Sequence, residues 1–211
     1  MIRRSAFKAF SLCTGVITVL ALSACAMLSD MPEQQIESLI NVAPEKAVLV
    51  GRIELQPPLQ ENEQIIKTTQ GNDFRNAFIL YAGDRLKDFK TSPPDTFEGS
   101  YITNLGREFF IKVDKGRTLS ISGGMFYTVY DPPYRIESHA VSSPFQVEIK
   151  ADDDAVYIGT IQLVRDDRNN ITSVLIRDDY QWADDTYKAR FGTRKTLRKA
   201  LIEPAVFPTG N

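Results

Sequence analysis

The pattern of apolar residues after Ala47 is the strongest constraint on the fold. These residues come in short runs separated by turn residues, and their spacing follows the period of two that a half-buried strand shows. The clearest runs lie at residues 47–55, 78–81 and 108–113. They predict a mainly β protein, and we expect a single antiparallel β-sandwich.

The sequence Asp-Lys-Gly at residues 114–116 predicts a tight turn, because glycine tolerates a positive φ there. Residues 118–122 return from this turn, so we expect a hairpin. Gly123 and Gly124 should break its edge. Residues 125–130 and 144–149 are then predicted as further strands.

Residues 156–164 are apolar on both faces, which is typical of a central strand. A polar turn at residues 165–170 follows. Residues 171–177 alternate in polarity, with Val174 and Ile176 facing inward, and should close a second hairpin.

The period changes after Asp178. Tyr180, Ala183, Tyr187 and Phe191 have helical spacing, and Gly192 is placed to end the helix. Asp178 or Asp179 is the expected N-cap.

A second short helix is expected from the spacing of Leu197, Ala200 and Leu201, with Pro204 ending it. We therefore expect one or two short C-terminal helices packed on the sandwich. The domain with its helices should span residues 46–204, and a tail should follow at residues 205–211.

The N-terminus has the features of a secretory signal. Arg3, Arg4 and Lys8 precede an apolar stretch at residues 9–22. Residues 22–25, Leu-Ser-Ala-Cys, resemble the lipobox of bacterial lipoproteins. This resemblance implies cleavage after residue 24 and lipidation of Cys25. Residues 26–41 are polar and mixed, so we expect a lipidated tether over residues 25–45, with one short helix near residues 33–40.

An uncleaved membrane helix is the alternative, but the stretch is weakly apolar for that purpose. Two or more acyl chains give stable anchoring, which the lipoprotein modification supplies. Ala26 stands where some lipoproteins have aspartate, and this resembles the pattern of proteins sent to the outer membrane. We expect a lipid-anchored protein of the bacterial cell envelope, facing either side of its membrane.

Loss of residues 1–24 would leave 187 residues, enough for one domain with a sizeable core. The remaining 22 basic and 27 acidic residues argue against nucleic acid as a partner. With Cys13 removed and Cys25 lipidated, the mature fold is expected to contain no disulfide.

One family resemblance bears on the fold. Gly116 with the strand after it, and residues 156–161 with their hairpin, resemble bacterial lipoproteins with a transthyretin-like or carboxypeptidase-regulatory-like sandwich. The resemblance spans about residues 47–177, implies a fold, and carries no catalytic residues with it.

No recognisable catalytic motif is present, so we expect no enzymatic activity and no cofactor. His139 is the only histidine, and its polar surroundings predict a solvated loop. A hydrolase built on paired carboxylates stays open, because only the distance between carboxylates would reveal it.

Two charged features are candidate contact sites. Aspartates at strand ends are weak candidates for calcium, although most are explained as turn formers and helix caps. The candidate metal ligands are Asp152, Asp154, Asp166 and Asp167. A basic stretch containing Arg194, Lys195 and Arg198 is either a contact surface or a solvated face.

Three aromatic residues complete the candidates for ligand or partner contact. Tyr130 and Tyr134 flank a proline turn, and Trp182 lies off the apolar stripe of the predicted helix. We hypothesise a non-enzymatic module that binds another envelope protein or assembles with it. The alternative is an envelope domain that binds glycan or calcium.

Overall fold

Strand β7 (Ala155–Arg165) is the centre of the structure, because three other strands pair with it and both of its faces are buried. The computed structural model describes residue 39 and residues 42–64, 76–86, 99–130, 135–193 and 195–205. All of them belong to one compact unit, Pro32–Asn211. The central strand predicted at residues 156–164 is confirmed.

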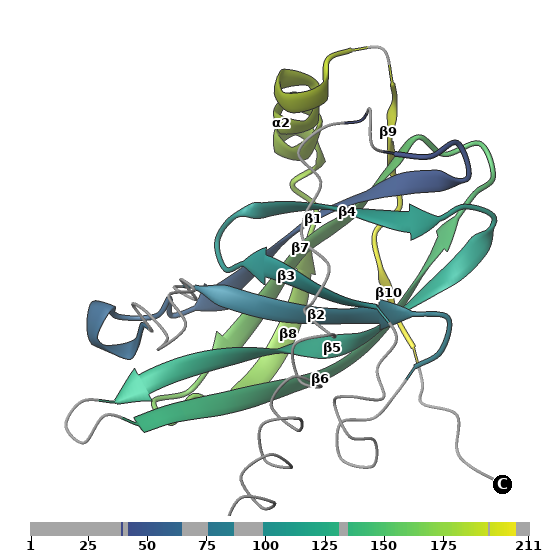
Figure 1. Cartoon of the computed structure of the whole chain (residues 1–211). Helices are drawn as coiled ribbons and strands as arrows, with labels where there is room; N and C mark the ends of the chain where they lie inside the picture. Colours follow the sequence, from purple (N-terminus) through teal and green to yellow (C-terminus); the bar gives the residue numbers. More distant parts are fainter. Residues whose placement is uncertain are drawn as a thin grey trace, which may run out of the picture. The chain divides into compact units, whose positions relative to one another are not determined.

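Two packed β-sheets and one α-helix make up the described residues (Figure 1), which confirms the predicted mainly β sandwich with a short helix. The β7 sheet has the order β4 (Glu108–Asp114), β1 (Lys46–Gln56), β7, β8 (Ile171–Arg177), with β9 (Leu197–Lys199) also on β7. The β5 sheet has the order β10 (Glu203–Pro204), β6 (Arg135–Ile149), β5 (Arg117–Tyr130), β2 (Ala77–Gly83), β3 (Ser100–Asn104). The β5 sheet is antiparallel, whereas β1 and β9 run parallel to β7.

The main core lies between the two sheets. Ile158 and Leu49 of the β7 sheet pack in one buried cluster with Ile121 and Val147 of the β5 sheet. Burial of each large apolar side chain contributes about 1.5–3 kcal/mol to the free energy of folding. The described residues include no cysteine, so apolar packing in this cluster holds the two sheets together.

Helix α2 (Tyr180–Phe191) covers part of the outer face of the β7 sheet. Its Ala183 and Tyr187 pack in a second buried cluster with Tyr157 of β7. The helix begins after Asp179 and ends at Gly192, which has a φ of 82°. The predicted helix and its ends are confirmed.

The turn at residues 114–116 does not close a hairpin, so this prediction was wrong. Strand β4 pairs with β1, whereas β5 pairs with β2 and β6, and the turn carries the chain from one sheet to the other. Val113 and Leu119 thereby enter the same core from opposite sheets.

Gly123 and Gly124 lie inside β5 and do not break it, which is a second correction. A Cβ at Gly124 would lie 2.0 Å from the ring of Phe78 on β2. At Gly123, where φ is 127°, it would lie 1.9 Å from the carbonyl oxygen of Val141 on β6. The absence of side chains lets both neighbouring strands approach β5 closely.

His139 lies in strand β6 and not in a solvated loop, so this prediction was also wrong. Ser138 and Ala140 are exposed, whereas His139 is half-buried and Val141 is buried. The polar run is the exposed face of a strand, since alternate residues of a strand point to opposite sides of the sheet.

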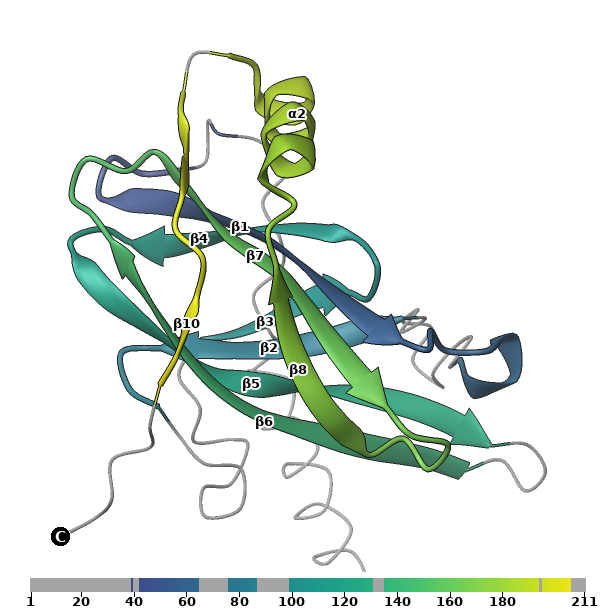
Figure 2. The ribbon, with the colours of Figure 1, turned by 180° about the vertical axis from the view of Figure 1, so that it is seen from behind.

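The second predicted helix is absent from the described residues, because this segment forms β9 and β10. The amide of Ala200 donates to Tyr157 O (2.9 Å), and the amide of Ile202 donates to Ile158 O (3.0 Å). Its backbone is thus bonded to β7, and β10 then pairs with β6. The segment therefore bridges the two sheets along one side of the sandwich (Figure 2).

The predicted signal and Cys25 lie outside the described residues, as does all of the predicted tether helix except Leu39. Leu39 and Val42 pack against the cluster beneath α2. Among the described residues, no helix is long and apolar enough to cross a membrane.

Candidate functional site

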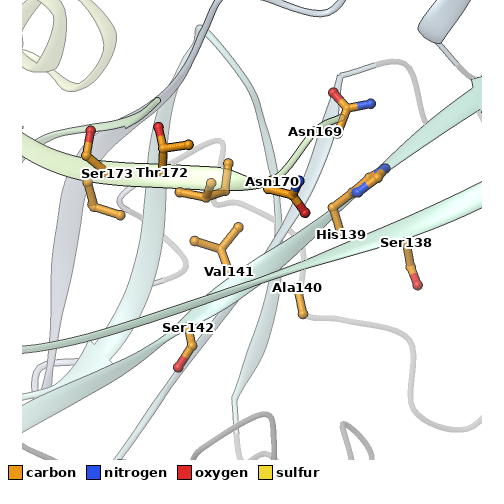
Figure 3. Close-up of a pocket in the computed structure, with 11 residues that line it drawn as sticks. Ser138, His139, Ala140, Val141, Ser142, Asn169, Asn170, Thr172 and Ser173 are labelled. Atoms are coloured by element: carbon orange, nitrogen blue, oxygen red, sulfur yellow. The ribbon is translucent and has the colours of Figure 1, made fainter. Parts of the chain in front are cut away.

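A groove of about 620 Å³ lies between strand β6 and strand β8. One wall is formed by residues 138–142 of β6, and the other by residues 169–174, from the turn before β8 and from β8 itself (Figure 3). The two strands belong to different sheets. The groove is therefore an opening at the side of the sandwich.

The groove is lined by polar side chains and carries no charged residue. On the β8 wall, hydroxyl and amide groups come from Asn169, Asn170, Thr172 and Ser173, whereas Ser138 and Ser142 border the groove on β6 with their side chains pointing away from β8 (Figure 3). Val141 and Val174 add apolar surface. Such a lining favours a neutral, hydrogen-bonding ligand, because a charged group would lose water here without gaining an opposite charge.

His139 is held rigidly beside this groove. Its Nε2 lies 2.7 Å from Thr128 Oγ1, and its ring stacks on Phe126 with 4.8 Å between centroids. Burial lowers the pKa of His139 below its ordinary value, and nearby Arg165 acts in the same direction against Glu137 and Glu63. The imidazole is therefore neutral at pH 7.

Arg165 shapes one end of the groove through a buried polar cluster. The side chain of Arg165 is only 5% exposed, and its Nη1 and Nη2 donate to the two carboxylate oxygens of Glu63 at 2.7 and 2.8 Å. It also donates to the carbonyls of Pro57 (2.9 Å) and Pro58 (2.8 Å). The hydrogen bond from Arg165 lowers the pKa of Glu63, so this carboxylate is ionised at neutral pH.

The same guanidinium holds the turn that leads into β8. Arg165 donates to the side-chain oxygen of Asn169, which is buried and has a φ of 63°. Asp166 accepts from the amide and side chain of Asn170. Arg165 was predicted in a polar turn, but it ends β7 and is buried; no sequence signal links it to Glu63, which is 102 residues away.

Both strands beside the groove have open edges. Among the described residues, β8 pairs only with β7, and β6 pairs on this side only at Phe145 and Gln146. Residues 138–144 of β6 and 171–176 of β8 contain no charged residue. Exposed edges normally carry charges that prevent further pairing, and these two segments do not.

Each of these strands also exposes a large apolar side chain. Ile136 of β6 is 47% exposed and Leu175 of β8 is 50% exposed, and these are the exposed large hydrophobics of the described residues. Each alternates with residues that face the inter-sheet core, so Ile136 and Leu175 lie on the outer faces of the two sheets that border the groove. Exposed apolar side chains of this size on open strands mark contact surfaces.

The predicted basic contact residues lie elsewhere and are paired with aspartates. Arg198 forms a bidentate ion pair with Asp153 (2.6 Å for each contact), and Lys195 lies 3.7 Å from Asp154. Arg194 is outside the described residues. The aspartate groups and the basic stretch thus neutralise each other in part, which weakens both as binding sites.

The weak metal candidates are not brought together. Asp152 and Asp154 lie in the turn before β7, whereas Asp166 and Asp167 lie in the turn after it. Asp166 is occupied by hydrogen bonds within its own turn. In the described part of the chain, no group of three possible ligands could hold a metal ion.

The aromatic candidates do not form a patch that the structure describes. Trp182 is half-buried beside the cluster under α2, and the guanidinium of Arg52 lies 4.7 Å from its ring centroid. Tyr134 and the side chain of Tyr130 are outside the described residues. Trp182 therefore contributes packing and a cation–π contact.

Comparison with known proteins found no matching family model, no similar curated protein and no similar solved structure. The site is therefore argued from its own geometry.

We predict that Arg165→Met lowers the free energy of unfolding by about 3 kcal/mol or more, because it leaves Glu63 partly buried without its cation. Arg168→Met, in the exposed turn three residues later, is the matched control and should change stability by less than about 0.5 kcal/mol. Urea unfolding measures both. Equal effects of the two substitutions would contradict the role given to Arg165.

Proposed function

We propose that this chain is a lipid-anchored protein of the bacterial cell envelope, most simply of the outer membrane, and that its sandwich binds another envelope protein without catalysing a reaction. The lipobox-like residues before Cys25 support the anchor. The observation that carries the binding role is the pair of open strand segments without charge, residues 138–144 of β6 and 171–176 of β8, which border one groove and lie on strands that each expose a large apolar side chain.

The surroundings of His139 favour binding over chemistry. Its hydrogen-bonded partner Thr128 would be the nearest nucleophile, but Thr128 is fully buried and its hydroxyl cannot reach a substrate. Glu63, the nearest carboxylate of the Arg165 cluster, is engaged by Arg165 and by the amide of Gln60 (2.8 Å). These groups position the wall of the groove.

A neutral glycan is the second candidate ligand. The hydroxyl and amide groups of the groove, such as Asn170 and Ser173, match the hydrogen-bonding groups of a sugar. A protein partner is preferred because glycan binding gives no account of the open backbone edges or of Leu175.

Cys25→Ser should abolish anchoring, because serine has no thiol to receive the lipid. We expect the variant to incorporate no labelled fatty acid and to retain its first 24 residues, as read by mass spectrometry. Cys13→Ser, within the discarded segment, should be processed normally. Normal lipid incorporation in Cys25→Ser would contradict the anchor.

A photoreactive residue placed at Leu175 or at Ile136 should crosslink to the same envelope protein in intact cells. The matched control is the same photoreactive residue at Ala189, which is exposed on α2 and should not give this product. Mass spectrometry identifies the product. A protein captured equally from Ala189, or no protein product from Leu175 and Ile136, would contradict the binding role.

A further inference from the structure

Strand β10 shows that the edge of β6 accepts an added strand. Glu203 and Pro204 pair with Gln146 and Phe145 in antiparallel register, and the amide of Ala205 donates to Pro144 O at 2.9 Å. The C-terminal segment of the chain thus closes the gap between the sheets beside residues 144–146. The groove begins at the next residues of the same edge, 138–142.

The backbone of β6 has hydrogen-bonding groups available along this groove. Val141 O and Ser143 N lie against Gly123, so they point toward β5. Backbone groups of successive residues in a strand point to opposite edges. The N–H and C=O groups of Ser138, Ala140 and Ser142 therefore point to the open edge, where no strand of the described residues pairs with them.

The chemistry of the groove also restricts what can pair there. Its lining carries no charge; Arg165, which holds the lining residue Asn169, is paired with Glu63, and Asp166 accepts hydrogen bonds from the lining residue Asn170. Val141 and Val174 face the groove from opposite walls. An added strand would place alternate side chains near these valines, and its central residues should be uncharged.

We infer that the partner binds by strand addition: an extended, uncharged segment of the partner, with alternating apolar residues, pairs with Ser138–Ser142 of β6 and fills the groove beside β8. This deepens the proposed function and depends on it. The segment would continue the row of added residues that β10 begins, and its outer side chains would lie on the same face of the β5 sheet as Ile136.

The test uses the full-length, membrane-anchored chain with the photoreactive residue at Ile136, on the strand that would accept the added segment. Ala140→Pro removes one outward N–H that is not used in pairing with β5, and Ala140→Lys places a charge on the open edge. Ala140→Ser keeps the N–H and is the matched control. We expect the crosslinked product to fall about tenfold in Ala140→Pro and in Ala140→Lys, and to stay within about twofold in Ala140→Ser.

The thermal unfolding of each variant shows whether the sandwich is intact, and Ala140→Lys provides the answer if Ala140→Pro does not fold. The segment crosslinked from Ile136 should map to an uncharged stretch of the partner with alternating apolar residues. Unchanged crosslinking in folded Ala140→Pro and Ala140→Lys would overturn strand addition and leave the proposed function standing. No protein product in the unaltered chain would overturn both, and a product formed with this chain's own residues after Ala205 would overturn strand addition by a partner.

Discussion

The burial of β7 on both faces is the constraint on which the rest of the structure depends. Its inner residues hold the β5 sheet, its outer residues hold α2, and its edges are taken by β1, β8 and β9. Strand β9 pairs only with Ala155–Tyr157 of β7, so the rest of that edge of β7 pairs with β8. Strand β8 is therefore an edge strand of its sheet, and it lies across the groove from the unpaired part of β6.

The groove follows from how the C-terminal segment is placed. This segment pairs with β7 and then with β6, and so closes part of the opening between the sheets. Arg165 supports the other end of the opening by fixing Asn169 and the segment around Pro57 and Pro58. Between these two supports, a polar and uncharged space remains. A strand from another protein would satisfy the backbone groups that border it.

Local patterns in the sequence predict where the strands and the helix lie better than they predict which strands pair. The two-faced apolar run of β7, the alternation of β8 and the spacing of α2 are each visible within a dozen residues. The turn at Gly116 looks the same whether its strands pair with each other or separate into two sheets, so the hairpin prediction failed. The spacing of Leu197 and Ala200 also fits both a helix and the bridging segment, and bonds to β7 decide between them.

The candidate site was harder to predict, because its parts are distant in the sequence. Glu63 and Arg165 meet only in the folded chain, and the open edges are a property of sheet order. The aspartates and basic residues that stood out in the sequence proved to be partners of each other at several positions, such as Asp153 with Arg198. Clusters of charged residues in the sequence therefore indicated structural ion pairs and not a binding site. The groove is bordered by serine, threonine and asparagine, which are common in strands and turns and so gave no signal in the sequence.

Amide hydrogen exchange tests the central claim most directly. The exchange of Ser138, Ala140 and Ser142 would be compared between the anchored protein in isolated envelopes and the soluble form that begins after Cys25. The account predicts that these three outward amides exchange at least about tenfold more slowly in the envelope, because a partner strand accepts their hydrogen bonds. Equal exchange rates in the two forms would contradict it.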